Sequence, residues 1–273
     1  MHTPVLLEKA IDALNVAQGK KYIDATYGEG GHAREIVRRG GEVLGLDWDP
    51  AVAKAFGDSD RKGKLTVITA NYADIKRIAQ KYNFAPCSGV IFDLGLSMGQ
   101  IRDSSRGFSY EALDGPLDMR ISLSLQATAA DIVNSYSESR LYELFSKISQ
   151  EVNSRAIAEA FVRARSIEQI RTVRDVISAL KKNKIGSKKT LARIFQALRI
   201  EVNHELENIQ SGIAGAAKII KKTGKIVVIT FHEVEDRLVK NKAREHGLRI
   251  YKVESKELKR FERSAHIRVL TVT

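Results

Sequence analysis

The stretch IDATYGEGGH, residues 23–32, places Asp24 just before a turn that contains three glycines. A glycine-rich turn between a first strand and its helix lets a ligand approach the backbone closely. Gly28, Gly30 and Ala33 fit the pattern G-x-G-x-x-A, which is weak evidence by itself. The segment therefore predicts a ligand-binding loop, and its specificity must come from the residues around it.

A second acid, Asp47, ends the next apolar segment, 23 residues after Asp24. An acid at the end of the second strand can hydrogen-bond the ribose hydroxyls of an adenosine. The alternative is that Asp47 is an ordinary turn acid. Loop and acid together predict an adenosine-containing cofactor, without choosing between a dinucleotide and S-adenosylmethionine.

Three features favour S-adenosylmethionine. Asp24 can meet the ammonium group of the cofactor, whereas a helix N-terminus alone favours phosphates. Tyr72 follows the third predicted strand, where it can stack on the adenine ring; the alternative is an ordinary strand-end aromatic. Asp93 ends the fourth predicted strand, at the edge where open α/β sheets hold their ligands. We hypothesise that Asp93, or a backbone carbonyl of residues 94–97, accepts a hydrogen bond and a proton from a substrate amine; the alternative is that Asp93 contacts only the cofactor.

The elements that position these residues alternate along the first hundred residues. Strand patterns cover 21–26, 41–49, 64–72 and 88–95, and helix patterns cover 32–41, 50–58 and 73–82. This alternation predicts βαβ units and a parallel sheet. From 102 to about 200 the patterns are helical, and the last of these patterns runs over 191–220. Strand patterns return at 224–232, 248–255 and 265–273, with a helix at 235–247. We therefore predict an α/β sheet interrupted by a helical insertion.

The positive charge lies mainly after the glycine loop. The chain carries a formal net charge of +12, and residues 1–101 contribute 13 basic and 12 acidic side chains. Residues 102–200 carry 17 and 11, and residues 201–273 carry 15 and 10. The run KKNKIGSKK, 181–189, holds five lysines, which by themselves often form only a solvated face. The excess as a whole favours a polyanionic partner such as RNA.

Composition excludes several classes. No apolar run approaches the roughly 20 residues of a membrane helix, and one cysteine, Cys87, excludes an internal disulfide or a cysteine metal cluster. The segment MHTPVLLEKAID lacks the basic leader of a signal peptide. We expect a cytoplasmic protein with no membrane partner and no metal; a monomer and a homodimer both remain open.

Ten blocks occur in an order that resembles a known family: HTPVLL, DATYGEGGH, DWDP, FDLGLS, RGFSY, DGPLDMR, TAADIVN, FQALRIEVNHEL, FHEVEDR and RSAHIR. The chain is similar, from residue 2 to about 268, to the small-subunit ribosomal RNA cytosine-N4 methyltransferases, the ribosomal RNA small subunit methyltransferase H family. The resemblance implies a Rossmann-like class I methyltransferase sheet over residues 1–103 and 200–273. It also implies an inserted, all-helical substrate-recognition domain over residues 104–199.

The resemblance also implies the function and the site. It implies methyl transfer from S-adenosylmethionine to the N4 amine of a cytidine in 16S ribosomal RNA, within the small ribosomal subunit, without a metal. The implied cofactor contacts are Gly30, Gly31, His32, Asp47, Tyr72, Asp93 and Gln100. The candidate substrate residues are the polar residues of the matching blocks, namely Arg106, Asp118, Arg120, Arg199, Asn203, His232, Asp236, Arg237 and Arg263.

The chain departs from the family pattern at several places, including a C-terminal block with less arginine and no proline and an insert without the proline common before FQALR. Ser97-Met98-Gly99 stands where the family usually shows two serines and a proline, and Glu233-Val234 stands in place of Ser-Leu. The segment DMRISLS lacks the acid that commonly follows DMR. Alternative functions therefore stay open: methylation of another RNA amine, or RNA binding by a protein that keeps only the cofactor fold. An NAD-dependent oxidoreductase is less favoured because YELFSK lacks the Tyr-x-x-x-Lys spacing.

Overall fold

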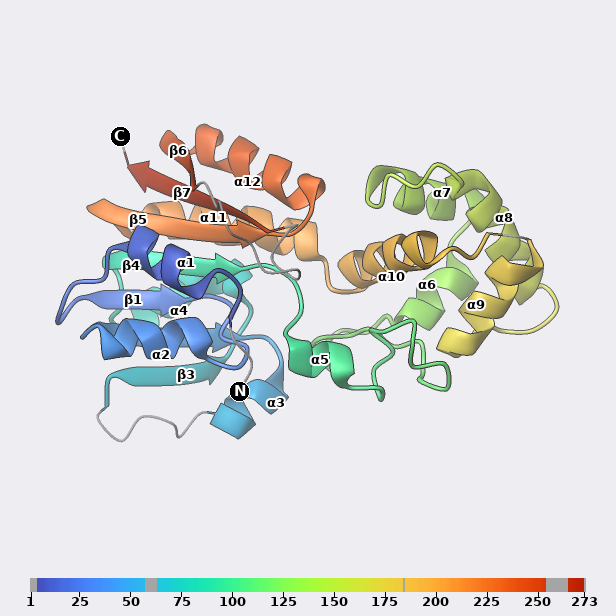
Figure 1. Ribbon diagram of the computed structural model, residues 1–273, viewed down its shortest axis with the longest axis horizontal. Coiled ribbons are helices and arrows are strands. Elements are labelled where there is room, and N and C mark those ends of the chain that lie inside the picture. Colours follow the sequence, from blue (N-terminus) through green and yellow to red (C-terminus); the bar gives the residue numbers. More distant parts are fainter. Residues whose placement is uncertain (1–3, 57–62, 184, 254–264, 273) are drawn as a thin grey trace. The chain divides into compact units, whose positions relative to one another are not determined.

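The computed structural model describes residues 4–56, 63–183, 185–253 and 265–272. The chain forms two compact units (Figure 1). We call Met1–Ser97 with Leu206–Thr273 the sheet unit and Met98–Glu205 the helical unit. The helical unit thus extends six residues further at each end than the insertion predicted over 104–199.

The described residues of the sheet unit form one seven-stranded sheet of order β3-β2-β1-β4-β5-β7-β6. The first five strands in this order run parallel, and β7 is antiparallel to both β5 and β6. The strands are β1 Lys21–Asp24, β2 Glu42–Asp47, β3 Leu65–Thr69, β4 Cys87–Asp93, β5 Ile220–Thr230, β6 Leu248–Val253 and β7 His266–Val272. The predicted α/β class with a parallel sheet is confirmed.

Helices cover both faces of this sheet because successive strand residues point to opposite sides and both sets are apolar. Ile23 belongs to a core cluster that includes residues of α4, α11 and α12. Its neighbour Tyr22 belongs to a second cluster with residues of α1 and α2. The helices are α1 Leu7–Leu14, α2 Gly31–Arg38, α3 Pro50–Phe56, the 3-10 turn Tyr72–Asp74, α4 Ile75–Lys81, α11 Glu205–Ile219 and α12 Glu233–Glu245. None of the helices among the described residues is long and apolar enough to cross a membrane.

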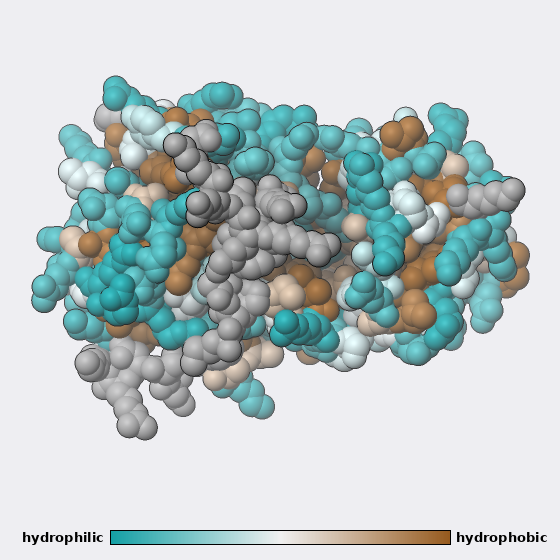
Figure 2. Space-filling view, viewed as in Figure 1, coloured by the Kyte–Doolittle hydropathy of each residue, from teal (hydrophilic) through white to brown (hydrophobic). Residues whose placement is uncertain are grey.

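The described part of the helical unit packs six helices of its own. They are α5 Met98–Arg102, α6 Ala129–Ser135, α7 Glu138–Lys147, α8 Ser154–Arg165, α9 Val173–Lys182 and α10 Lys188–Val202. Thr128 and Asp131 form a capping box at the start of α6, and Thr172 and Asp175 form another at the start of α9. Such reciprocal bonds satisfy backbone donors that a helix start leaves unpaired. Figure 2 shows mainly hydrophilic side chains on the visible face of this unit, interrupted by hydrophobic patches.

The sequence predicted the elements near the glycine-rich turn well and missed three features. The helical pattern over 191–220 contains a break, because His204 adopts a left-handed backbone conformation (φ 49°) that an α-helix cannot continue. Helices α1 and α5 were not predicted; each is short, at 8 and 5 residues. Strand β5 begins at Ile220, four residues before the predicted start. Each difference lies where tertiary contacts, rather than local periodicity, decide the backbone.

Candidate active site

The glycine-rich turn joins β1 to α2 and is fixed to the neighbouring strand. The Gly28 N–H donates to Asp47 Oδ2 at 2.8 Å, so an acid from the end of β2 holds the turn. Gly28 has a positive φ of 53°, and a Cβ added there would meet nothing closer than Ser97 Cβ at 3.7 Å. Gly28 is therefore required by its backbone conformation, which a residue with a side chain rarely adopts.

Gly30 and Gly31 lack side chains for a different reason. A Cβ on Gly30 would overlap the Tyr27 hydroxyl, and one on Gly31 would overlap Pro4 Cγ. Both glycines thus admit a neighbouring side chain of the same unit. Their contact with the cofactor, which the family resemblance implied, stays a prediction.

Asp24 lies at the carboxyl end of β1 with 1% of its surface exposed. Its Oδ1 accepts the Thr26 N–H at 3.2 Å, while its Oδ2 is buried and has no hydrogen-bond partner among the described residues. Burial raises the pKa of Asp24 to about 7; the Thr26 N–H opposes this shift, and the nearby Asp47 charge adds to it. A buried carboxylate oxygen without a partner is costly, so this group is suited to a cationic ligand.

Asp93 repeats this arrangement at the end of β4. Its backbone N–H donates to Thr26 Oγ1 at 2.7 Å, which fixes the end of the strand. The side chain is 23% exposed, but Oδ1 is buried without a partner in the described part of the chain. Burial raises the pKa of Asp93 to about 8, and the charges of Asp24 and Glu235 contribute. Asp93 is thus both buried enough to be a base near neutral pH and open enough to meet a ligand.

His32 lies in the first turn of α2, beside Asp93. Its Nε2 is 3.3 Å from the Val5 carbonyl oxygen and can only donate there, and its Nδ1 is 3.9 Å from Asp93 Oδ2. Burial lowers the pKa of His32 to about 4. The imidazole is therefore neutral at pH 7, with its proton on Nε2 and its Nδ1 lone pair toward Asp93.

Three other predicted cofactor residues have identified surroundings. Asp47 accepts the N–H groups of Gly28 and, at 2.9 Å, Asp49, so it braces the loop. Tyr72 packs edge-on against Phe92 with ring centroids 5.6 Å apart and is half-buried. Gln100 lies on α5 in the helical unit. Ribose, adenine and cofactor contacts by these residues stay predictions.

The start of α12 holds a second acidic group. Glu235 is 1% exposed, and its Oε2 accepts the backbone N–H groups of Phe231 and His232 at 3.0 and 3.3 Å. Asp236 accepts two hydrogen bonds from Arg268, at 2.7 and 2.9 Å, and also pairs with Lys240. The positions of Glu235 and Asp236 are therefore explained by bonds within the sheet unit.

A role in RNA binding for His232, Asp236 and the exposed Arg237 stays a prediction. Arg263 lies outside the described residues. Sequence reasoning missed Thr230, which ends β5 and has a buried Oγ1 without a partner in the described part of the chain. Its only signal was its position just before the block FHEVEDR.

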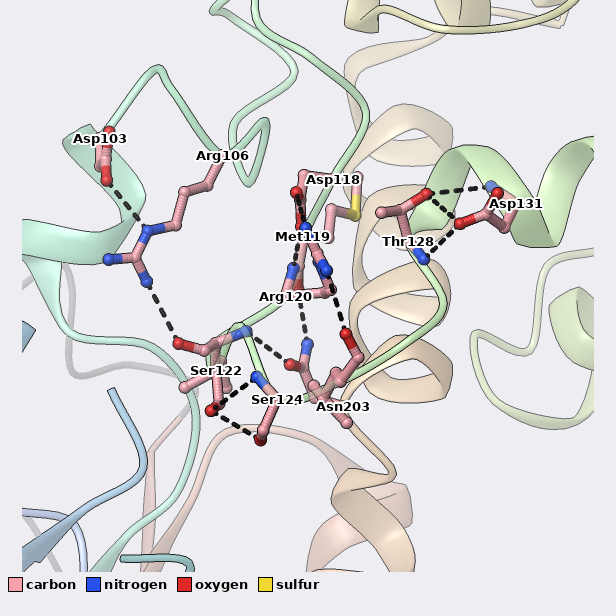
Figure 3. A network of polar contacts seen from close by, with 12 residues as sticks. Asp103, Arg106, Asp118, Met119, Arg120, Ser122, Ser124, Thr128, Asp131 and Asn203 are labelled. Carbon is pink, nitrogen blue, oxygen red and sulfur yellow. Dashed lines mark hydrogen bonds and ion pairs between the residues drawn. The ribbon is translucent and has the colours of Figure 1, made fainter. Parts of the chain in front are cut away.

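The candidate substrate residues of the helical unit form a bonded network (Figure 3). The Asn203 side chain is fully buried; its Nδ2 donates to the carbonyls of Met119 and Arg199, and its Oδ1 accepts the Ile121 N–H at 2.7 Å. Arg120 donates twice to Asp118, at 2.8 Å each, and once to the Leu125 carbonyl. These bonds define the backbone of residues 118–125.

Two further arginines of the set are also paired. Arg106 is 3.1 Å from Asp103 and donates to the Ile121 carbonyl at 3.3 Å. Arg199 makes a two-bond ion pair with Glu205, at 2.7 and 2.9 Å. The structure brings Arg106, Asp118, Arg120 and Asn203 together in one place, while their contact with RNA stays a prediction. Among the described residues, no group of three His, Cys, Asp or Glu side chains could hold a metal ion.

A sheet of this strand order, with a glycine-rich turn after β1 and acids at the ends of β1, β2 and β4, defines a class I methyltransferase dependent on S-adenosylmethionine. The chain belongs to the MraW methylase family, whose profile matches residues 1–272.

Three curated relatives are all named ribosomal RNA small subunit methyltransferase H. The protein from Thermomicrobium roseum is 44% identical, over 88% of this chain and 76% of the relative. The protein from Azobacteroides pseudotrichonymphae is 41% identical, over 88% and 79%. The protein from Bacteroides fragilis is 38% identical, also over 88% and 79%. The family resemblance predicted from the sequence blocks is confirmed.

Proposed function

We propose that this protein transfers a methyl group from S-adenosylmethionine to the exocyclic N4 amine of one cytidine in 16S ribosomal RNA, in the cytoplasm and within the small ribosomal subunit. Family membership and the names of the relatives support the substrate. The observation that carries the chemistry is the pair of buried oxygens on Asp24 and Asp93 that have no partner among the described residues.

The residues of the site fit this cofactor. S-adenosylmethionine supplies a methyl group activated by a sulfonium, and it also carries an ammonium. Asp24 and Asp93 offer two carboxylates to these positive charges, at adjacent strand ends of the parallel sheet. Gly28 offers backbone without a side chain. Gly30, Gly31, His32, Asp47, Tyr72 and Gln100 complete the proposed binding set.

Asp93 is the proposed proton acceptor. Cytosine N4 is a poor nucleophile because its lone pair is delocalised into the ring, so the site must align the amine and accept its hydrogen bond. The amine nitrogen forms the bond to the methyl carbon, the carbon–sulfur bond breaks with its electron pair left on sulfur, and Asp93 takes the proton from N4. A carboxyl with a pKa of about 8 is well matched to this task at neutral pH.

The neutral His32 assists by facing Asp93 with a lone pair and no charge. A protonated imidazole would lower the basicity of the carboxylate; a neutral one leaves it high. Asp93 stays ionised while positive charge lies beside it, and its proton affinity rises once that charge has been consumed. The same carboxylate can therefore bind first and accept a proton later.

The helical unit is proposed to bind the RNA. The target base must be unpaired or flipped to reach the site. Arg106, Asp118, Arg120, Arg199, Asn203, His232, Asp236, Arg237 and Arg263 remain the proposed substrate set. The exposed Lys181, Lys182, Lys188 and Lys189 would add salt-dependent affinity for phosphates without base preference.

The test is methyl transfer to small ribosomal subunits that lack the cytosine-N4 mark. Purified protein is incubated with methyl-labelled S-adenosylmethionine, the RNA is digested, and its nucleosides are separated. Label in N4-methylcytidine is the expected result. Label in another nucleoside would move the proposal to a different RNA amine, and no label despite measured cofactor binding would favour a protein that only binds RNA.

A further inference from the structure

Thr26, which bonds to both acids of the candidate site, has a hydroxyl that the proposed chemistry does not use. It follows β1 closely, and its backbone N–H donates to Asp24 Oδ1 at 3.2 Å. Its Oγ1 accepts the Asp93 N–H at 2.7 Å. One residue thus contacts Asp24 through its backbone and Asp93 through its side chain. Its hydroxyl therefore lies at the ends of the paired strands β1 and β4.

The Thr26 hydroxyl takes the place of a backbone carbonyl at the end of the sheet ladder. The Ala25 N–H donates to the Ile91 carbonyl at 2.9 Å, as in a parallel ladder. A ladder continued by one step would direct the Asp93 N–H to the Ala25 carbonyl, but Thr26 Oγ1 accepts this N–H instead. The chain can therefore leave the sheet toward the glycine-rich turn while the last N–H of β4 keeps an acceptor.

The bond from Asp93 engages the hydroxyl oxygen of Thr26 and leaves the hydroxyl proton available. A hydroxyl can donate one hydrogen bond while it accepts another, and no acceptor for this proton occurs among the described residues. Thr26 is half-buried, so a ligand can reach it. The backbone N–H groups of residues 26, 27, 28 and 30 already donate to acceptors of the same unit. The Thr26 O–H is therefore a donor that this turn keeps for a ligand.

A ligand with an amino-acid group requires a donor at this place. Asp24 and Asp93 each keep one buried oxygen without a partner in the described part of the chain, which suits an ammonium. The α-carboxylate of an amino acid is bonded to the same carbon as its ammonium, so it must lie close to the acids that bind the ammonium. Like charges repel each other there, and a hydrogen bond donated to the ligand's carboxylate offsets this repulsion.

We propose that the Thr26 hydroxyl donates a hydrogen bond to the α-carboxylate of S-adenosylmethionine and thereby selects ligands that carry the complete amino-acid group. The bond from the Asp93 N–H fixes the hydroxyl oxygen, so this donor is held in place before the ligand binds. A hydrogen bond to an ionised acceptor is stronger than one between neutral groups. This inference rests on the proposed function, which supplies the cofactor.

The test compares S-adenosylmethionine with its decarboxylated analogue, which keeps the sulfonium and the ammonium and lacks the carboxylate. Calorimetry with the full chain measures Kd for each ligand. The wild-type protein should bind S-adenosylmethionine about tenfold or more tightly than the analogue. Thr26→Val keeps the shape of the side chain without the hydroxyl, so the ratio of the two Kd values should fall toward one. Thr26→Ser keeps the hydroxyl and should keep the ratio.

Thr66→Val is the matched control, because Thr66 is an exposed threonine on β3 of the same unit, and it should leave the ratio unchanged. Thr26→Val also removes the acceptor of the Asp93 N–H. That loss should weaken both ligands alike, since both carry the ammonium, and the ratio therefore isolates the bond to the carboxylate. Urea unfolding verifies that each variant is folded. Thr26→Cys replaces Thr26→Val if the latter does not fold, because a thiol is only a weak donor.

A wild-type ratio near one, a wild-type ratio retained in Thr26→Val, or equal losses of the ratio in Thr26→Ser and Thr26→Val would each overturn the inference. The labelled-subunit assay separates it from the proposed function. A ratio that depends on Thr26 without methyl transfer to RNA would leave the inference standing and defeat the proposed reaction; transfer with a ratio independent of Thr26 would do the reverse.

Discussion

The two units treat their buried polar groups in opposite ways. The three buried side-chain oxygens that lack partners among the described residues, on Asp24, Asp93 and Thr230, all lie in the sheet unit, at the ends of β1, β4 and β5. In the helical unit, Asn203 and the Asp118–Arg120 pair have their partners close at hand. In the proposed cofactor site Asp24 and Asp93 each keep one oxygen without a partner among the described residues, whereas the loop at 118–125 satisfies its polar groups internally.

The largest expected effect tests whether the unpartnered acid Asp93 of the sheet unit takes part in the reaction. Asp93→Asn keeps the shape of the side chain and removes the proton acceptor, so single-turnover methyl transfer should fall about 10²- to 10⁴-fold. Cofactor affinity, measured separately by calorimetry, shows how much of the loss is binding. Asp12→Asn, at a 66% exposed side chain of the same unit, is the control. Unchanged turnover together with unchanged affinity would remove Asp93 from both roles.

The substitution Asn203→Ala tests whether the hydrogen-bond network of the helical unit holds its loop. This change removes the side-chain partner of the Met119 carbonyl and of the Ile121 N–H, while the Arg199 carbonyl keeps the backbone N–H of residue 203, so urea unfolding should show a loss of about 2–4 kcal/mol. The exposed Asn153, whose side chain makes one long bond of 3.5 Å to Glu151, gives the control Asn153→Ala. A loss for Asn203→Ala no larger than for this control would show that the network does not hold the loop.

A smaller effect is expected on the pH dependence of S-adenosylmethionine affinity. Raised pKa values mean that Asp24 and Asp93 are partly protonated at pH 7 in the free protein, and a cation requires them ionised. Affinity for S-adenosylmethionine should therefore increase by about tenfold between pH 6 and 8, with release of protons on binding. Calorimetry in buffers of different ionisation enthalpy counts those protons.

The stability of the free protein should decrease as pH rises, whereas the cofactor affinity increases. The unfolded chain releases these protons near pH 4, whereas the folded protein keeps them until about pH 7 to 8. The contribution of both groups to the free energy of unfolding therefore falls as pH rises across that range. Asp24→Asn should flatten both profiles; profiles identical to wild type would contradict the assignment.

The smallest expected effect concerns surface charge. Replacing Lys181, Lys182 and Lys188 by alanine should weaken RNA binding severalfold at physiological salt and reduce the slope of log K against log salt by about 0.7 for each lost phosphate contact. The matched control replaces the exposed Lys20, Lys54 and Lys76 of the sheet unit. Equal losses in both triple variants would show that RNA affinity reflects net charge alone.

The sequence by itself determined the sheet unit's plan. Period-two apolar runs, turn glycines and the acids at 24, 47 and 93 are local signals, so the strands, the loop and the placement of the acids are predictable from the residue pattern alone. The family blocks added the activity and the expected substrate class. Local patterns could not show that Gly31 makes room for Pro4, since those residues meet only after the chain has folded.

Only the tertiary structure decided which predicted polar residues are paired. Their polar type and their place in the family blocks made Asn203 and Arg120 candidates for substrate recognition, and the fold brings partners to them from up to 84 positions away in the sequence. The same assembly leaves one oxygen each of Asp24 and Asp93 buried and unpartnered in the described part of the chain, which raises their pKa values. Pairing and burial are properties of neighbours in space, and a residue's type and spacing along the chain do not specify those neighbours.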